Sequence, residues 1–177
     1  PVTEIPDLLE GMYAYTVLDE IEGVIHLSRD LQGEKSLFIY EDEHITIISS
    51  EIPAIQQLIP GIPMDAQSLR DYFRTRHFML FSRTAYQGIR QILPGKIECL
   101  KIDTNQWSMV TSRKLSDWID PDQMEKNASR SLDNLADELD ALIIQTVKEM
   151  RPSRERYAAV VSGGIDSSLL GHYLVTH

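Results

Sequence analysis

Short apolar segments, alternating or rich in branched residues, dominate the first half of the chain. Acidic and glycine-bearing turns such as DEIEG, LQGEK and EDEH separate them, which is the pattern of consecutive antiparallel strands. This pattern predicts an antiparallel meander with strands over Met12–Leu18, Val24–Arg29, Ser36–Tyr40 and His44–Ser49. A later hairpin is predicted from two alternating segments, Lys96–Asp103 and Trp107–Thr111.

Helical spacing follows in two short segments and one long one. The short helices are predicted over Glu51–Leu58 and over Asp65–Arg74, the second with Asp65 as its N-cap. The long helix is predicted from Leu132 to Met150, where apolar residues recur every three or four positions after a capping Ser131. The polar stretch 113–130 between the hairpin and this helix is predicted to be a linker.

The pattern changes near the end of the chain. Tyr157–Val161 is a continuous apolar run, which predicts a strand buried on both faces of a parallel sheet. The segment SGGIDSS follows at Ser162–Ser168, and helical spacing resumes over Leu169–Leu174. A strand, a glycine loop and a helix in this order are the opening of a nucleotide-binding α/β domain.

The net charge and the single cysteine indicate which partners and which cellular compartment to expect. The 27 acidic and 17 basic residues give a net charge of −10, which offers no attraction to nucleic acid or to an anionic membrane. We find no apolar run of about 20 residues, as a membrane span needs, and the first residues do not resemble a signal peptide. The single cysteine, Cys99, is predicted to be buried in a strand, and its isolation favours the cytoplasm.

The loop SGGIDSS has the chemistry of a polyphosphate site. Gly163 and Gly164 can adopt conformations that other residues avoid, and they leave the main chain open to a ligand. Main-chain N–H groups at a helix N-terminus favour anions, and the three serines of the loop add hydroxyl donors. Asp166 would be repelled by phosphate unless a cation lay between them, so it is predicted to help hold Mg²⁺.

Two familiar phosphate loops are excluded, and a plainer alternative stays open. No Gly-Lys-Ser/Thr follows the glycines, so the segment is not a Walker A loop, and G-x-G-x-x-G is absent. The alternative is a glycine turn that caps a helix and binds no ligand.

The segment V-S-G-G-I-D-S-S resembles the pyrophosphate-binding loop of the N-type ATP pyrophosphatases. Among them it is most similar to the glutamine-dependent asparagine synthetases. Four upstream segments resemble this family in the same order and at about the same spacing: Leu9–Tyr15, Ser28–Phe38, Ser49–Ala54 and Tyr86–Gly95. The resemblance spans residues ~8–177 and is weakest in the linker.

The resemblance implies an α+β fold followed by the start of an α/β domain. Residues 1–112 would form an Ntn-hydrolase-like glutaminase domain of layered antiparallel sheets with helices, lacking its N-terminal part. Residues 113–130 would be the linker. Residues 131–177 would begin an ATP pyrophosphatase domain with a parallel sheet, of which the chain contains the first strand, loop and helix.

The resemblance also implies the chemistry of asparagine biosynthesis. In that family glutamine supplies ammonia, ATP adenylates a carboxylate such as aspartate with release of pyrophosphate, and ammonia displaces AMP to form an amide. ATP and Mg²⁺ are the implied cofactors. The residues expected to bind them are Val161 through its backbone, with Ser162, Gly163, Gly164, Asp166, Ser167 and Ser168, and Asp166 is the implied metal ligand.

Departures from the family leave alternatives open. The family's glutaminase nucleophile is an N-terminal cysteine, whereas the chain begins Pro1-Val2, so no catalytic residue is assigned and the chain alone is expected to be inactive. Glu10 and Ser36 differ from the usual Asp and Pro. β-Lactam synthetases, lasso-peptide cyclases, a non-catalytic glutaminase-like interaction domain and a tRNA-modifying adenylating enzyme therefore remain alternatives. A homodimer is one assembly that the resemblance allows.

A few other polar residues receive structural interpretations. Arg29-Asp30 is predicted to be a structural ion pair, and His172 to lie on the surface. Glu51 is predicted to favour the N-terminus of its helix, with an interface between domains as the alternative. The acidic residues of the long helix, Asp133, Asp137, Glu138 and Asp140, are predicted to form its solvated face.

Overall fold

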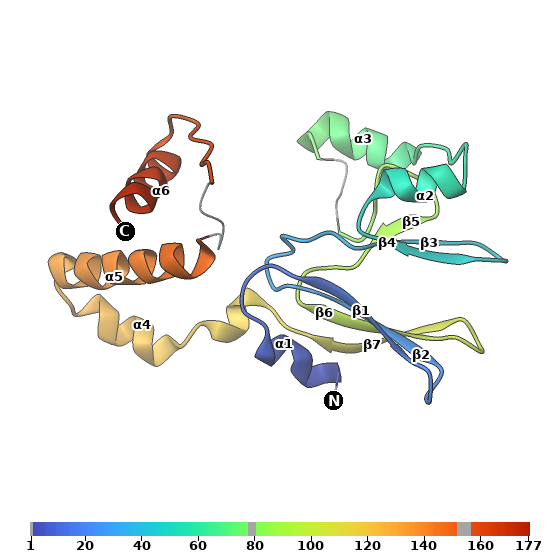
Figure 1. Cartoon of the computed structure of the whole chain (residues 1–177), viewed down its shortest axis with the longest axis horizontal. Helices are drawn as coiled ribbons and strands as arrows, with labels where there is room; N and C mark the ends of the chain where they lie inside the picture. The colour runs from blue at the N-terminus through green and yellow to red at the C-terminus, as the bar shows by residue number, and fades with distance from the viewer. Residues whose placement is uncertain (1, 78–80, 152–156) are drawn as a thin grey trace. The chain divides into compact units, whose positions relative to one another are not determined.

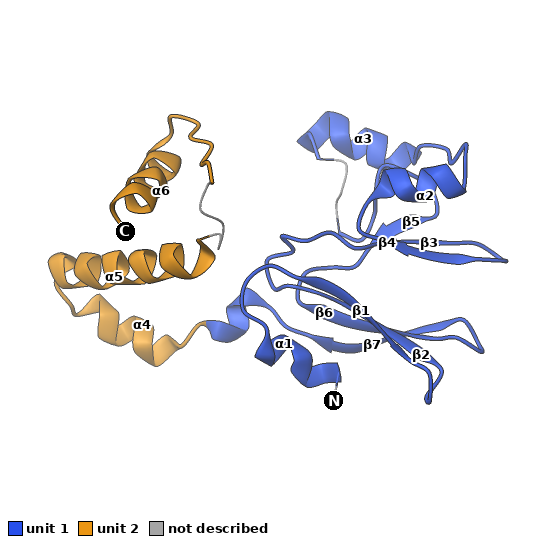
Figure 2. Cartoon of the chain, viewed as in Figure 1, with its two compact units in different colours: residues 1–118 blue, residues 119–177 orange. Residues whose placement is uncertain are grey.

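The chain divides into two compact units. The computed structural model describes residues 2–77, 81–151 and 157–177. The first unit comprises residues 1–118 and the second residues 119–177 (Figure 2).

The first unit contains two antiparallel sheets that lie as layers (Figure 1). The larger sheet has the strand order β1-β2-β6-β7, and the smaller sheet has the order β4-β3-β5. The strands are β1 Ala14–Asp19, β2 Val24–Arg29, β3 Phe38–Glu41, β4 Thr46–Ser49, β5 Ile89–Gln91, β6 Lys96–Lys101 and β7 Gln106–Ser112.

The pairing within each predicted hairpin is confirmed, but the single meander is wrong. β1 pairs with β2, β3 with β4, and β6 with β7, all antiparallel. Between β2 and β3 the chain leaves one sheet and enters the other. The reason is burial, because Leu27 of β2 and Ile39 of β3 both have zero exposure and meet in one core between the layers.

Each face of the smaller sheet has its own apolar core. Ile39 packs with Leu27 and Ile92 between the sheets. The preceding residue, Phe38, points to the opposite face and packs with Ile55 of the following helix, as the two-residue period of a strand requires. A strand with apolar residues on both faces can therefore join two layers.

The two short helices predicted in the first unit are confirmed with small shifts in their ends, and three further short helices were not predicted. The described helices are η1 Val2–Glu4, α1 Ile5–Leu8, α2 Ile52–Leu58, α3 Ala66–Thr75 and η2 Leu115–Trp118. Asp65 is the N-cap of α3, and its carboxylate accepts a hydrogen bond from the N–H of Ser68 at 2.7 Å. Figure 1 shows α2 and α3 on the side of the smaller sheet that faces away from the larger one.

The second unit consists of helices, namely α4 Pro121–Ala128, α5 Leu132–Met150 and α6 Ile165–Thr176. The long predicted helix is confirmed as α5, with Ser131 accepting from the N–H of Asn134 at 3.3 Å. α5 and α6 pack together. Val147 and Tyr173 are buried there, and the Tyr173 hydroxyl donates a hydrogen bond to Asp140.

The strand predicted over Tyr157–Val161 is wrong for this structure. These residues are not in a strand, and Val160 is 97% exposed. A strand is stabilised by hydrogen bonds to a neighbouring strand, and the described residues of the second unit include no such neighbour. The helix after the loop begins at Ile165, four residues before the predicted Leu169. The predicted domain boundaries at 112 and 130 stay a prediction.

Two further predictions from composition can be compared with the structure. Cys99 lies in β6 as expected but is only partly buried. Among the helices of the described residues, none has the length and apolar character to cross a membrane.

Candidate functional site

The segment SGGIDSS spans the N-terminus of α6. Ser162–Gly164 precede the helix, and Ile165–Ser168 form its first turn. Gly163 has φ +83°, a left-handed conformation that disfavours any residue with a Cβ. Apart from its chain neighbours, no heavy atom of the described residues lies within 4 Å of the position that a Cβ would occupy there. Gly164 is the N-cap of α6 with φ −74°. The loop therefore presents an open main-chain surface at the positive end of a helix.

Two serines close the loop on itself. The Ser167 hydroxyl accepts a hydrogen bond from the N–H of Ser162 at 3.2 Å, and the two hydroxyls lie 3.0 Å apart. Ser167 also donates to the carbonyl of Gly164 at 3.2 Å. Ser162 and Ser168 are exposed, whereas Ser167 is partly buried. The structure thus brings the predicted loop residues together, with Ser167 organising the loop and the others open to a ligand.

Asp166 lies in the first turn of α6 and is exposed. No group of three or more His, Cys, Asp and Glu within the described residues could hold a metal ion. A single carboxylate is nevertheless enough for Mg²⁺ in phosphate sites, where water and phosphate oxygens complete the coordination. The loop chemistry therefore fits a magnesium-bound polyphosphate.

In the first unit, Arg29 is the buried centre of a main-chain network. It is 5% exposed, and its guanidinium donates to the carbonyls of Lys35 and Gly33, each at 2.6 Å, and of Ile92 at 2.5 Å. A fourth bond runs to Gln91 at 3.2 Å. Burial lowers the pKa of Arg29. The predicted structural role is confirmed, but the described hydrogen bonds of Arg29 go to carbonyl oxygens, and Asp30 acts on the guanidinium through its charge.

Asp30 holds the same turn as a hydrogen-bond acceptor, whereas Arg29 holds it as a donor. Its carboxylate accepts from the N–H groups of Gln32, Glu34 and Lys35 at 3.0–3.1 Å. Burial alone would raise the pKa of Asp30, but these main-chain donors outweigh it and lower the pKa. Arg29 and Asp30 together hold the turn that follows β2, so they act on the fold of the unit.

Asp30→Asn is expected to lower the free energy of unfolding at neutral pH by about 2 kcal/mol, because the new amide nitrogen faces a main-chain donor. The pKa of Asp30 is depressed in the folded state, so its contribution is present above the ordinary value of 3.8 and is lost as pH falls through the folded-state pKa. Urea unfolding at neutral pH and below pH 3.8 measures the difference between the proteins.

The matched control for Asp30→Asn is Asp103→Asn. The Asp103 side chain is 67% exposed and pairs only with Lys101 at 3.5 Å, so this change should alter stability little at either pH. If the free energies of unfolding of wild type and Asp30→Asn differ as much below pH 3.8 as at neutral pH, the charge of Asp30 does not stabilise the turn.

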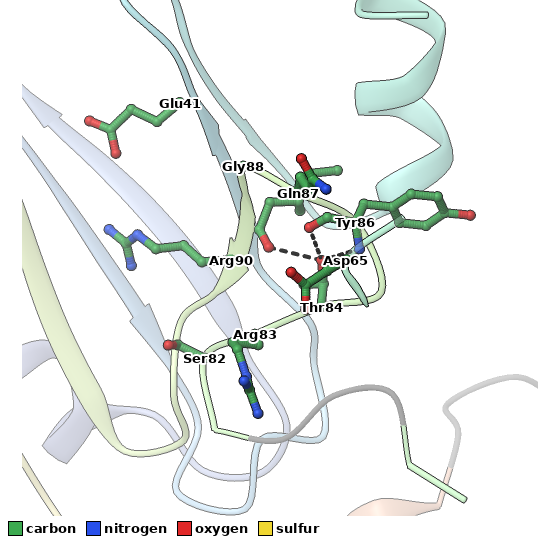
Figure 3. A pocket seen from close by; sticks show the side chains of 10 residues that line it. Glu41, Asp65, Ser82, Arg83, Thr84, Tyr86, Gln87, Gly88 and Arg90 are labelled. Carbon is green, nitrogen blue, oxygen red and sulfur yellow. Dashed lines mark hydrogen bonds between the residues drawn. The ribbon is translucent and has the colours of Figure 1, made fainter. Parts of the chain in front are cut away.

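Figure 3 shows a pocket of about 360 Å³ beside β5. Thr84 at its centre is buried and donates to the carbonyl of Ile89 at 2.8 Å. The side chains of Glu41 and Arg90 are directed away from the ring of Tyr86. The polar groups around this pocket therefore do not converge on one point.

The charged groups of this pocket also have partners within the chain. Arg90 pairs with Glu98 at 2.7 Å and stacks over Trp107 at 4.4 Å. Glu41 accepts from the Trp107 indole at 2.8 Å. Arg83 pairs with Asp71 at 2.5 Å. These contacts stabilise the first unit and leave the loop at Ser162–Ser168 as the stronger candidate site.

The remaining predicted residues lie as follows. His172 is exposed, as predicted. The four acidic residues of α5 are exposed as well, although Asp140 also accepts from Tyr173. Glu51 is the N-cap of α2, without a side-chain capping bond.

Sequence reasoning missed two glycines that the fold requires. A Cβ at Gly33 would lie 2.6 Å from Pro94, and one at Gly95 would lie 2.4 Å from the carbonyl oxygen of Arg113. Both glycines have positive φ. The Leu93-Pro94-Gly95 turn is visible in the sequence, but nothing in the sequence indicates what the turn contacts.

Comparison with known proteins places both units in context. Residues 3–113 match the glutamine amidotransferase domain family. The chain is 24% identical over 167 residues to the "Putative asparagine synthetase (glutamine-hydrolyzing) 1" of Methanocaldococcus jannaschii, covering 92% of the chain. It is also 24% identical over 181 residues to a "Putative asparagine synthetase (glutamine-hydrolyzing)" of Mycobacterium tuberculosis, covering 99% of the chain.

These relatives are much longer, since the chain spans 26% of the length of each. The family match covers both sheets of the first unit, from β1 to β7, and the turn held by Arg29 and Asp30. The similarity to both relatives extends into the second unit. The chain therefore belongs to the glutamine amidotransferase domain family and is distantly related to asparagine synthetases.

Proposed function

We propose that this chain is part of an ATP-dependent ligase that adenylates a carboxylate and converts it to an amide with ammonia from glutamine. The observation that carries the proposal is the loop Ser162–Ser168, folded at the N-terminus of α6 in the same chain as an amidotransferase domain. An amidotransferase domain supplies ammonia, and an anion-binding loop suits the phosphates of the activating nucleotide.

The surface of α6 supports a position inside a larger domain. Apolar side chains lie all around this helix, and Ile165 and Val175 are 86% and 88% exposed. A helix that is apolar on every side is typical of a buried position. In the proposed ligase, the nucleotide-binding domain would cover these side chains and hold the loop against ATP.

The loop residues would act on the pyrophosphate half of ATP. Main-chain N–H groups at Gly163 and Gly164 and the hydroxyls of Ser162 and Ser168 would bind the β- and γ-phosphates, and Val161 would contact the nucleotide through its backbone. Asp166 would hold Mg²⁺, which neutralises charge on the leaving pyrophosphate. A carboxylate oxygen attacks the α-phosphorus, pyrophosphate leaves, and ammonia then displaces AMP.

The acid that is activated defines the alternatives within this class. The names of the two relatives favour aspartate as the acid. β-Lactam synthetases and lasso-peptide cyclases activate other acids with the same architecture. We propose the cytoplasm as the compartment, because a lone cysteine suits reducing conditions.

Exchange of labelled pyrophosphate into ATP tests the proposal in the whole natural protein. With Mg²⁺ present, we expect exchange only when the cognate acid is added, because exchange requires reversible adenylation. Aspartate, the other amino acids and small dicarboxylic acids form the panel, and chelation of Mg²⁺ is the control. Glutamine hydrolysis without exchange on any acid would refute the ligase and favour a plain amidotransferase or regulatory role.

A further inference from the structure

The main chain leaves the larger sheet through two consecutive hydrogen bonds. Arg113 directly follows β7, and its N–H donates to the carbonyl of Gly95 at 2.8 Å. The N–H of Gly95 in turn donates to the carbonyl of Asp30 at 3.0 Å. The exit from the larger sheet is therefore joined to the buried turn of Arg29 and Asp30 by main-chain contacts.

Gly95 allows this approach because it has no side chain. Its φ is +67°, and a Cβ there would lie 2.4 Å from the carbonyl oxygen of Arg113 and 3.0 Å from Leu31. The first contact is with backbone, so no side-chain rotation could relieve it. Any larger residue at position 95 would push the exit segment away from the turn.

The side chain of Arg113 holds a different segment. Its guanidinium makes a bidentate pair with Asp7 of α1 at 2.6 and 2.8 Å, and it donates to the carbonyl of Thr3 at 3.3 Å. The hydrogen bond from Arg113 lowers the pKa of Asp7, and the same bond raises the pKa of Arg113. The bidentate geometry orients the two groups more strictly than a single contact would.

We propose that Asp30, Gly95, Arg113 and Asp7 form an exit clamp that fixes where the chain leaves the larger sheet of the amidotransferase unit. The main chain of Arg113 is held by the turn, and its side chain holds the N-terminal helices η1 and α1. The chain as far as Arg113 is therefore tied to the amidotransferase fold by both its main chain and a side chain. This inference does not depend on the ligase activity.

Amide hydrogen exchange of the whole protein tests the main-chain half of the clamp. In Gly95→Ala, the Arg113 amide should exchange at least about tenfold faster, because its acceptor is displaced. Gly23→Ala is the matched control, since Gly23 has φ +64° but nothing within 4 Å of a Cβ. Gly23→Ala places alanine at a similar positive φ without the clash, so it should leave the exchange rate of the Arg113 amide unchanged.

The amides of Leu27 and Ile97 report global opening, because both residues are buried in the larger sheet. Their exchange should change little in Gly95→Ala relative to Gly23→Ala. Equal acceleration at all three amides, or none at Arg113, would overturn the clamp.

The side-chain half is tested by Arg113→Met and Asp7→Asn, which remain informative if Gly95→Ala does not fold. Each should speed exchange of the amides in η1 and α1 several-fold. The double variant should exchange no faster than Arg113→Met, because that variant already lacks the contact with Asp7. Arg113→Lys keeps the charge but cannot make the bidentate pair with Asp7. Exchange in η1 and α1 should therefore be slower than in Arg113→Met but faster than in wild type. Additive effects of the two single variants, or unchanged exchange in η1 and α1, would refute the pairing.

Discussion

Asp166→Ala is expected to lower acid-dependent exchange of pyrophosphate into ATP at least about a hundredfold in the whole protein. A metal ion contributes several kcal/mol to stabilising charge in such a reaction, and about 1.4 kcal/mol corresponds to each factor of ten. Asp166 is exposed in the first turn of α6 and forms part of no described metal cluster. Its removal costs the helix only about 0.3–1 kcal/mol through the dipole, so the loss would be chemical and not structural.

The controls for this experiment separate charge from fold. Asp137→Ala removes an equally exposed carboxylate from α5 and should leave exchange unchanged. Asp166→Asn keeps the shape but weakens metal binding, and excess Mg²⁺ should recover part of its exchange. Exchange that survives in Asp166→Ala would refute the metal role, even if the rest of the ligase proposal stands.

Arg29→Met is expected to lower the free energy of unfolding of the first unit by about 3–5 kcal/mol. The change leaves the buried carbonyl of Ile92 and the part-buried carbonyl of Gly33 without this donor, and an unsatisfied buried group costs about 1–3 kcal/mol. The carbonyl of Lys35 loses its donor as well. Urea unfolding followed by the fluorescence of Trp107, which packs against the core between the sheets, measures the loss.

Two further variants make this result specific. Arg70→Met removes an exposed arginine whose described bonds go to Gln67 in the same helix, so it should change stability by less than about 0.5 kcal/mol. Arg29→Lys keeps the charge but cannot reach three carbonyls at once, so it should recover only a small part. A loss in Arg29→Met no larger than in Arg70→Met would contradict the central role of Arg29.

Local signals in the sequence predicted the elements that depend on near neighbours. The side chains of Ser131 and Asp65 each accept a hydrogen bond from the main-chain N–H three residues later in the sequence. The starts of these helices could therefore be predicted from a few neighbouring residues. The β6–β7 hairpin follows for the same reason, because its two strands are separated by a short turn. The Ser162–Ser168 loop also kept its predicted place at a helix N-terminus.

Predictions failed where an element depends on a distant partner. Tyr157–Val161 has the composition of a buried strand but lies beside no strand in the described residues of its unit, and Val160 stays exposed. Arg29 was expected to pair with its neighbour Asp30, whereas its partners come from the turn at Lys35 and from Ile92, 63 positions away. The residues next to Arg29 in the sequence do not indicate which carbonyl groups surround its buried guanidinium.

The sequence by itself therefore determined the helices α2, α3 and α5, the hairpins and the place of the Ser162–Ser168 loop at a helix N-terminus. Capping, side-chain period and turn residues act over a few positions, so these features could be predicted. Only the tertiary structure decided that β2 and β3 lie in different sheets and that Gly95 meets Arg113. The physical reason is packing: burial of Leu27 against Ile39 selects the layers, and close contact between distant segments selects glycine where a Cβ has no space.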